Sequence, residues 1–490
     1  MQKDLQNIFK DHTITIVIIL TLFLGIFLRF YELTFQSYWF DELFSASVSN
    51  PANSLSEVFA RTVGDVHPPL YQILLWVWYH IFGYSEWVGR SFSAVMGVLG
   101  IVAIYLLGKE LYNKEVGLYA TIIASTNYFL IYYSQETRAY TLLFLLSIIS
   151  YLFLIRTLQS YSKLNFILYL FFTISLLYTH YFGFFFVATQ AGVFLWYIFM
   201  QREEPKHLII LAVITTISFI LAILPLVPYI LETMQRTSSW MLPPSPSFLI
   251  DYFKNYTLSP FIQKIFALLL LIATLHLFLK SEKSTMKKST LLLFIWIIIG
   301  YSLPYIKSIV SVPLLSEKNT MIVLPALILL IAYGVYSLRF YWLKIAIVGM
   351  IIFFALYHLY RMHYYDKVTK DEFKTVLLEI EKSQTNLPIY DFIMHGYQNN
   401  QYESFYFQTQ AMISHLDVKS YTSKTLQDRY NTTQTLPSCF WVVYAHDDYV
   451  SKVNLLKVKG LQKVTDITKH HAVGILYAYK TDLKKCLTHK

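Results

Sequence analysis

Long apolar stretches with charged residues mainly at their ends recur along the first three quarters of this chain. A helix rises about 1.5 Å per residue, so about 20 such residues cross the roughly 30 Å hydrocarbon core of a bilayer. Hydrophobic residues make up 56% of the sequence and charged residues 14%, against about 25% charged residues in soluble domains. The 490 residues therefore exceed what one water-soluble core can bury, and they predict a polytopic α-helical membrane protein.

About eleven segments have the length and composition of transmembrane helices. They are 13–33, 88–107, 117–133, 140–157, 164–179, 182–200, 207–229, 264–280, 289–307, 321–338 and 343–359. The first is too long for a signal-peptide core and lacks a small-residue cleavage site, which favours a retained anchor. The apolar segment 70–83 is shorter and rich in Trp and Tyr, which favours a position in the membrane interface.

The distribution of Lys and Arg predicts the orientation of the chain. With a cytoplasmic N-terminus and an interfacial segment 70–83, the basic loops all face the cytoplasm, as the positive-inside rule requires. These loops contain Lys109 and Lys114, Arg156 and Lys163, Arg202 and Lys206, Arg339 and Lys344, and the cluster Lys280, Lys283, Lys287 and Lys288. The net charge of +10 then reflects membrane orientation, because no Arg-rich arm indicates nucleic-acid binding.

The same topology predicts two domains. Residues 1–360 form the transmembrane catalytic domain, whose outer loop 34–87 contains interfacial helices, and residues 361–490 form a small soluble extracytoplasmic α/β domain. In this tail Phe373–Ile380 has the pattern of an amphipathic helix, and Phe440–Tyr444 and Val473–Ala478 have that of strands. Both cysteines, Cys439 and Cys486, lie here; in an oxidising compartment they either pair or remain two free thiols.

Acidic residues and a histidine gather in the first outer loop, where ionisable groups indicate a working site. Asp41 and Glu42 follow three aromatic residues, and Asp65 and His67 precede Pro68-Pro69. A carboxylate at headgroup depth can accept a proton from a hydroxyl group or bind a divalent cation. The alternative is a solvated pair of loop carboxylates, and for the prolines a simple helix start.

Several cations lie on the outer face, against the positive-inside trend. Arg138 follows Gln135 and Glu136 and precedes Tyr140, and the others are Arg61, Arg90 and Lys318. An anionic lipid headgroup would explain them, since a guanidinium group donates two parallel hydrogen bonds to a phosphate. The alternatives for Arg138 are snorkelling to headgroups or a salt bridge to Glu136. His180 and His276, near span ends, are interpreted as interfacial residues.

These motifs and their order resemble the membrane glycosyltransferases of the GT-C superfamily, in the branch of the protein O-mannosyltransferases and lipid A aminoarabinose transferases. The resemblance rests on the Asp-Glu pair, on Asp-x-His-Pro-Pro-Leu from Asp65, and on Ser-Gln-x-x-Arg-x-Tyr ending at Tyr140. It covers residues 10–200 and extends less well to Glu317–Pro325. There, Lys318-Asn319 stands where many relatives have Arg-Tyr, so this phosphate contact departs from the family pattern.

The resemblance implies an inverting glycosyltransferase that moves a hexose or pentose from a polyprenyl-phosphate donor to a lipid, glycan or protein acceptor. The reaction would occur at the outer face of a bacterial cell (inner) membrane. Asp41 would be the general base or orient the acceptor, with Glu42 beside it, and a divalent cation stays open as a cofactor. The cations Arg138, Lys318, Arg61 and Arg90 would bind the donor phosphate, and the pocket would be lined by Asp65, His67, Gln135, Glu136 and Tyr140.

Two other functions fit a membrane protein with these features. One is a polysaccharide polymerase or ligase that acts on lipid diphosphate-linked glycans. The other is a flippase or transporter of lipid-linked sugars, which would usually carry acidic groups at mid-membrane depth. The acidic residues here gather at one face instead, which favours an enzyme.

Overall fold

The computed structural model describes residues 2–65, 67–200, 205–235, 241–279, 284–383, 387, 389–393, 418–422, 438–445, 461–470, 472–483 and 486. The predicted cytoplasmic residues Arg202, Lys280 and Lys283 lie outside this part. The chain forms two compact units: Met1–Tyr31, Leu55–Leu74 and Arg90–Tyr364 make up the first, and Glu32–Ser54, Leu75–Gly89 and Tyr365–Lys490 the second. The outer loop 34–87 is thus divided between them.

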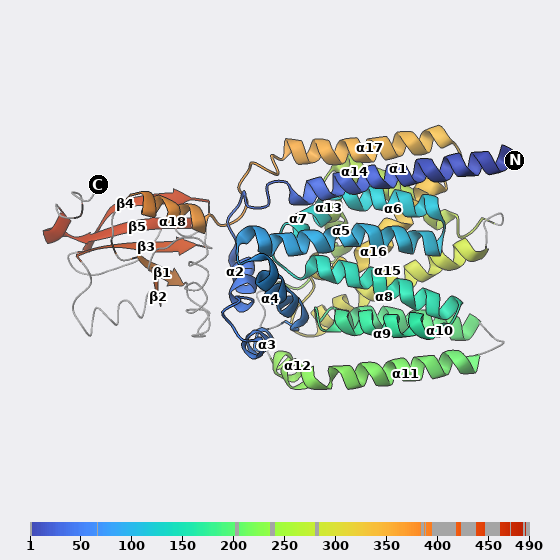
Figure 1. The fold of residues 1–490 in the computed structure, drawn as a ribbon, viewed down its shortest axis with the longest axis horizontal. Helices are drawn as coiled ribbons and strands as arrows, with labels where there is room; N and C mark the ends of the chain where they lie inside the picture. The colour runs from blue at the N-terminus through green and yellow to red at the C-terminus, as the bar shows by residue number, and fades with distance from the viewer. Residues whose placement is uncertain are drawn as a thin grey trace. The chain divides into compact units, whose positions relative to one another are not determined.

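The first unit is a bundle of helices, most of which lie side by side (Figure 1). Two helices are shared between the units: α4 begins in the first unit and ends in the second, and α5 begins in the second and continues into the first. The helices are α1 (Gln2–Phe30), α3 (Leu55–Val63), α4 (Leu70–Phe82), α5 (Glu86–Leu111), α6 (Lys114–Thr126), α7 (Tyr128–Ser134), α8 (Tyr140–Gln159), α9 (Lys163–Leu177), α10 (Gly183–Met200), α11 (Pro205–Ile223), α12 (Val227–Met234), α13 (Phe248–Thr257), α14 (Pro260–Leu275), α15 (Ser284–Val310), α16 (Leu324–Tyr336) and α17 (Tyr341–Arg361), with the short 3₁₀ helices η1 (Leu224–Leu226) and η2 (Asn319–Val323).

The structure confirms a polytopic helical membrane protein and places a helix at each predicted span. Among the described residues, eight helices are long and apolar enough to cross a bilayer. The other predicted spans differ: α6 and α7 break at Asn127, α9 has 15 residues, and α13 and α14 are bent by 116°. Helix α4 has only 13 residues, about 20 Å, so its length suits the predicted interfacial position.

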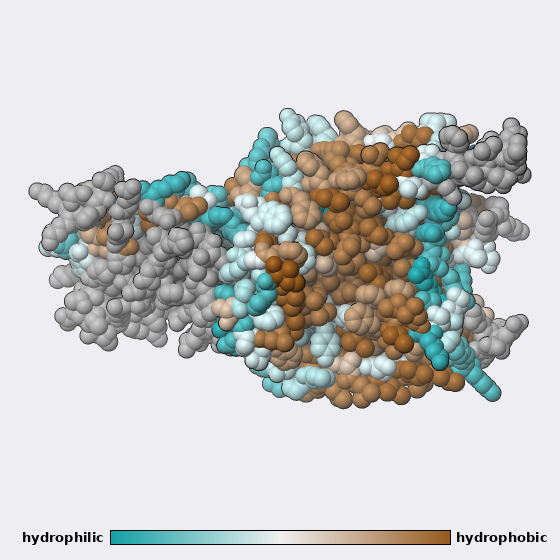
Figure 2. Space-filling model, viewed as in Figure 1, coloured by the Kyte–Doolittle hydropathy of each residue, from teal (hydrophilic) through white to brown (hydrophobic). Residues whose placement is uncertain are grey.

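Burial separates central helices from those that face lipid. In the apolar span formed by η2 and α16, 89% of the residues are buried, whereas in the apolar part of α17 only 17% are. Helices α1 and α11 are similarly open, and their exposed side chains are large and apolar. Figure 2 shows a broad hydrophobic band over the helical unit with hydrophilic residues along both of its edges. This surface suits a hydrocarbon solvent, in which exposed apolar side chains carry no penalty.

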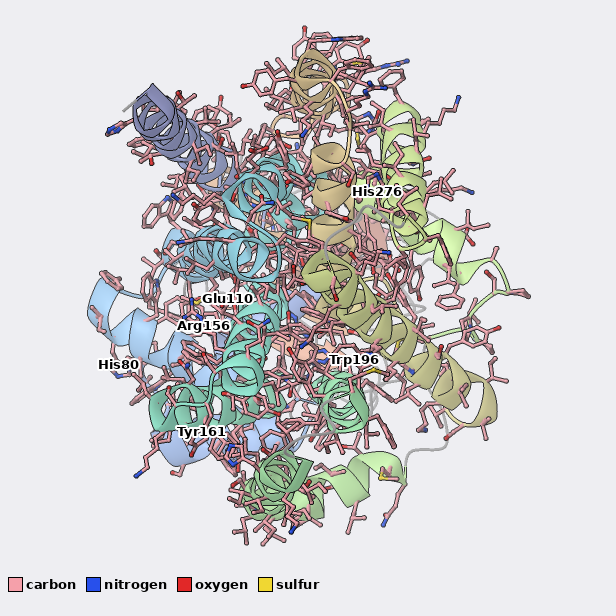
Figure 3. The ribbon with its side chains drawn as sticks, turned by 90° about the vertical axis from the view of Figure 1, so that its right-hand side faces the viewer. His80, Glu110, Arg156, Tyr161, Trp196 and His276 are labelled. Carbon is pink, nitrogen blue, oxygen red and sulfur yellow. A yellow bond between two sulfur atoms is a disulfide. The ribbon has the colours of Figure 1, made fainter. Side chains whose placement is uncertain are left out.

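Small residues allow the helices to approach closely, as is usual in membranes. A Cβ atom at Gly334 of α16 would lie 2.2 Å from the carbonyl oxygen of Leu269 on α14. A Cβ atom at Gly108 of α5 would lie 2.9 Å from the Cα atom of Gly117 on α6. At one end of the bundle Arg156 of α8 and Glu110 of α5 lie together (Figure 3), with Nε and Oε2 2.9 Å apart.

We expect Gly334→Ala to destabilise the bundle, because the backbone of α14 must move to admit the new methyl group. Overpacking of this kind costs about 1–3 kcal/mol, and thermal unfolding of the detergent-purified protein measures the loss. The matched control is Gly349→Ala on α17, where a Cβ atom meets nothing within 4 Å. There, alanine should be neutral or stabilise by up to about 1 kcal/mol. An equal effect of both substitutions would contradict close packing at Gly334.

The described part of the second unit contains a five-stranded mixed sheet in the order β2-β1-β3-β5-β4. Strand β1 is parallel to β2 and β3, and β5 is antiparallel to β3 and β4. Helix α18 packs against the sheet (Figure 1) through Val376 and Ile380, over Gly474. The elements are α2 (Phe40–Val48), α18 (Phe373–Lys382), β1 (Ile389–Ile393), β2 (Val418–Thr422), β3 (Cys439–Ala445), β4 (Leu461–Lys469), β5 (Ala472–Tyr479) and η3 (Lys480–Asp482).

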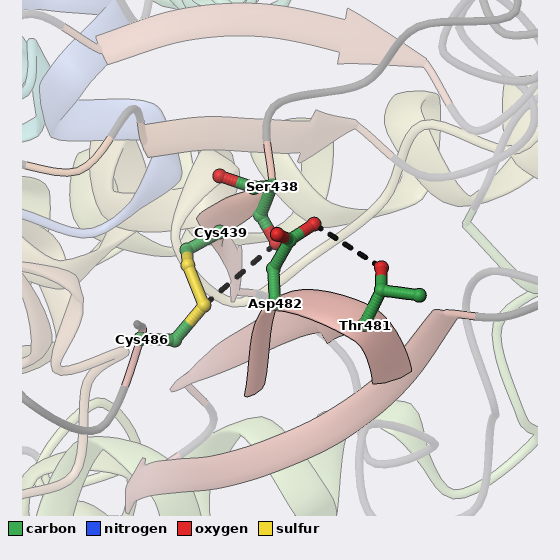
Figure 4. The surroundings of a disulfide bond; sticks show 5 residues. All are labelled: Ser438, Cys439, Thr481, Asp482 and Cys486. Atoms are coloured by element: carbon green, nitrogen blue, oxygen red, sulfur yellow. Dashed lines mark hydrogen bonds between the residues drawn. A yellow bond between two sulfur atoms is a disulfide. The ribbon is translucent and has the colours of Figure 1, made fainter. Parts of the chain in front are cut away.

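The predicted helix and both predicted strands of the tail are therefore present, as α18, β3 and β5. A disulfide joins Cys439, at the start of β3, to Cys486 (Figure 4), with their Cα atoms 5.9 Å apart. Both cysteines are buried and pack with Ala478, Leu387, Val464 and Leu483. Of the two alternatives that the sequence left open, the structure contains the pair.

Candidate functional site

Two loops of the first unit present the candidate site, and hydrogen bonds hold each of them. The loop between α3 and α4 contains Asp65 and His67, and its end is anchored by the bond from the Leu70 N–H to the Tyr178 carbonyl, 2.8 Å long. The loop between α7 and α8 contains Arg138, whose carbonyl accepts a 3.2 Å bond from the Ser93 hydroxyl of α5. Both loops thus rest on helices of the same bundle.

Asp65, His67 and Arg138 form a continuous chain of polar contacts. His67 Nδ1 lies 2.9 Å from Asp65 Oδ2, and Arg138 Nη2 lies 3.0 Å from His67 Nε2. A guanidinium nitrogen can only donate a hydrogen bond, so His67 Nε2 accepts one from Arg138. The proton of the neutral ring is then on His67 Nδ1, which donates a hydrogen bond to Asp65. The carboxylate therefore orients the histidine, and the histidine orients the buried guanidinium group.

His180, in the loop between α9 and α10, adjoins this chain. Its ring centroid lies 6.4 Å from that of His67 and 6.2 Å from that of Tyr140. Burial, helped by the positive potential of His67, Arg138 and Lys318, lowers the pKa of His180 to about 3. Sequence reasoning missed this residue because it treated His180 as an interfacial side chain at a span end.

The lowered pKa of His180 predicts acid sensitivity. The unfolded chain binds a proton at His180 near pH 6.5, whereas the folded protein resists protonation down to about pH 3. The neutral ring therefore supports stability above pH 6.5, and this contribution is lost as the pH falls below that value. We expect His180→Gln to reduce the drop in melting temperature between pH 7 and pH 5 by about 2 °C or more. The same drop in the wild type and in His180→Gln would contradict a neutral His180 ring in the folded protein.

Tyr140, which neighbours His180, is itself in contact with Lys318. Lys318 Nζ lies 5.7 Å from the Tyr140 ring centroid, within cation–π range. Its loop is held in place by Asn319, whose Nδ2 donates a 3.0 Å bond to the Leu314 carbonyl, and by Thr320, whose hydroxyl lies 2.6 Å from that of Tyr256. The departure from Arg-Tyr thus leaves a lysine near the cluster and gives the asparagine a structural contact.

The other predicted residues have different surroundings. Gln135 donates from Nε2 to the Tyr31 carbonyl at 2.8 Å, just beyond the end of α1, and accepts from the Tyr364 hydroxyl at 2.9 Å. Glu136 is 1% exposed beside Arg138, and Arg90 is 2% exposed within α5. Arg61 lies in the last turn of α3. The phosphate-binding role of both arginines stays a prediction.

Asp41 and Glu42 lie in the first turn of α2, in the second unit. Glu42 is fully buried, and its Oε2 lies 3.2 Å from Lys370 Nζ and 3.4 Å from the Trp39 backbone nitrogen. Asp41 is only half-buried. Within the described residues, no group of three or more His, Cys, Asp or Glu side chains could hold a metal ion.

Comparison with known proteins gives one family match. Residues 66–229 match the family model for dolichyl-phosphate-mannose-protein mannosyltransferase. This range, less than half of the chain, runs from the Asp65–His67 loop through Arg138 into the first turn of α12. No curated protein sequence matches the chain.

Solved structures match over nearly the whole chain. ArnT from Cupriavidus metallidurans in the apo state is 13% identical, with a TM-score of 0.61 over 94% of this chain and 97% of that one. The same protein bound to undecaprenyl phosphate is 14% identical, with a TM-score of 0.57 and the same coverage. AglB from Archaeoglobus fulgidus, in complex with an inhibitory peptide and a dolichol-phosphate, is 10% identical, with a TM-score of 0.55 over 89% and 70% of the two chains.

These matches show that the chain shares the fold of these membrane proteins, which agrees with the resemblance to the GT-C superfamily, and they define its class as a polytopic helical membrane protein. At sequence identities of 10–14%, these structural matches show a shared fold and leave the reaction open.

Proposed function

We propose that this protein is an inverting glycosyltransferase that uses a polyprenyl-phosphate sugar as donor. The Asp65–His67–Arg138 chain carries the proposal, because it holds a buried guanidinium group in one orientation at the end of a membrane bundle. A guanidinium group has five donors in a fixed fork, which suits a phosphate. The similarity in fold to ArnT bound to undecaprenyl phosphate supports the same ligand class.

The proposed step is a single displacement at the anomeric carbon. The acceptor oxygen attacks from the side opposite to the phosphate, and the bond between this carbon and the phosphate oxygen breaks with its electron pair on the phosphate. The polyprenyl phosphate leaves as an anion, so the site needs cations to stabilise growing charge. Arg138, assisted by Lys318, would supply this charge, while His67 and Asp65 keep the guanidinium group in place.

Asp41 is the proposed general base. It would take the proton of an acceptor hydroxyl as the new carbon–oxygen bond forms. A carboxylate with a reference pKa of about 3.9 is a weak base, so the proton must move late, when the hydroxyl has become acidic. A phosphate acceptor would not require this base, so the need for Asp41 also reports on the class of acceptor.

The proposed location is the outer face of a bacterial cell membrane. The disulfide between Cys439 and Cys486 supports an oxidising compartment for the tail, and the loop charges support a cytoplasmic N-terminus. A reporter fused after Lys490 should then be active outside the cytoplasm. Activity only inside would overturn this orientation.

The experiment that tests the function is transfer from radiolabelled polyprenyl-phosphate hexoses and pentoses in membranes that contain the protein. Label that leaves the donor lipid only when the protein is present supports the transferase and identifies the sugar. Movement of the donor between leaflets without transfer would indicate the flippase. Transfer only from lipid diphosphate-linked glycans would indicate the polymerase or ligase.

A further inference from the structure

The segment that precedes α18 contacts the first outer loop within the second unit. Gln36 Oε1 accepts hydrogen bonds from the backbone nitrogens of Thr369 and Lys370, 2.7 and 2.9 Å long. Lys370 also forms the buried ion pair with Glu42. These hydrogen bonds join segments that are more than 300 positions apart in the sequence, and they lie close to α2, the helix that carries Asp41.

The same segment is fixed to the sheet of the second unit. The Glu372 N–H donates to the His470 carbonyl at 3.0 Å, and Lys469 Nζ lies 2.5 Å from Glu379 Oε1 of α18. Lys374, at the start of α18, forms an ion pair with the buried Glu86. The sheet, α18 and the segment 369–374 therefore form a continuous support that reaches α2.

The burial of Glu42 makes its partner important. Its side chain has no exposed surface and that of Lys370 is 7% exposed. A buried carboxylate without a counter-ion is strongly unfavourable, whereas removal of both charges together is tolerated. Lys370 pairs with the buried Glu42, whereas the neighbouring Asp41 is half-buried, so part of it lies at the surface where an acceptor can reach it.

We infer that Lys370 is a positioning residue: through Glu42 it holds α2 in the orientation that presents Asp41 for proton transfer. The inference rests on the proposed function, and it assigns a role to the C-terminal unit, whose sheet and α18 support this lysine. Glu42 then acts as the anchor of α2 and Asp41 as the base.

The test compares kcat and donor KM for the full-length wild type and the variants Lys370→Met, Glu42→Gln and Glu42→Gln/Lys370→Met. Each single variant leaves one buried charge without its partner, so kcat should fall by at least about tenfold, with the donor KM changed by less than about twofold. The double variant removes both charges and should recover most of the lost kcat. The control is Lys367→Met, an exposed lysine three residues earlier, which should behave as the wild type.

The outcomes separate this inference from the proposed function. A double variant as inactive as Glu42→Gln would overturn the inference, because Glu42 would then be needed for its own chemistry. Wild-type kcat in Lys370→Met would also overturn it. If Lys370→Met fails to fold, the double variant decides, since an active double variant supports the ion pair as a positioning device and an inactive one refutes it. A wild type inactive with every donor would refute the function itself.

Discussion

Asp41→Asn is expected to lower kcat for a hydroxyl acceptor by about 10³-fold, within the range of about 10²–10⁴ for general base catalysis. Asparagine has the same shape but cannot accept the proton. Asp41 lies in the first turn of α2, so asparagine gives up a favourable interaction with the helix dipole of about 0.3–1 kcal/mol, which is too small to unfold the protein. Steady-state transfer with the labelled donor measures the loss, and donor KM should stay within about twofold because the proposed phosphate contacts are made by Arg138 and Lys318.

The matched control is Glu57→Gln, which removes an exposed carboxylate from the same outer loop and should leave transfer unchanged. If Asp41→Asn retains wild-type kcat with a hydroxyl acceptor, Asp41 is not the base. If transfer to a phosphate acceptor is unaffected while transfer to a hydroxyl is lost, the substitution identifies the acceptor class.

Arg138→Ala is expected to lower kcat/KM by about 10²–10³-fold, the usual loss when one preorganised donor to a developing charge is removed. The alanine variant loses the positive charge that would stabilise the leaving phosphate, and it also loses the contact to His67. Arg138→Lys keeps the charge but not the planar fork, so its activity should lie between those of the wild type and the alanine variant. Direct binding of polyprenyl phosphate should weaken in the same order.

Arg339→Ala serves as the control, since it removes an exposed arginine from the loop between α16 and α17. It should change neither transfer nor polyprenyl phosphate binding. Equal binding of polyprenyl phosphate by the wild type and Arg138→Ala would refute the phosphate role and leave the Asp65–His67–Arg138 chain a structural feature.

Local sequence patterns predicted the membrane helices because hydrophobicity over about 20 residues is a property of each segment alone. They also placed α18, β3 and β5, where amphipathic and alternating patterns are strong. They did not predict the break at Asn127, whose side chain accepts from the Leu130 N–H at the start of α7 and donates to the Tyr256 carbonyl. That break depends on a partner 129 positions away.

Hydropathy and local motifs were enough to predict a polytopic membrane protein and to identify Asp65, His67 and Arg138 as polar residues that are too costly in lipid to lack a function. Tertiary structure decided which of them touch: Arg138 meets His67 across 71 positions, and His180 joins them from another loop. It also decided that Glu42 pairs with Lys370 across 328 positions. Such pairings depend on how distant segments pack, and hydropathy and local motifs carry no record of that packing.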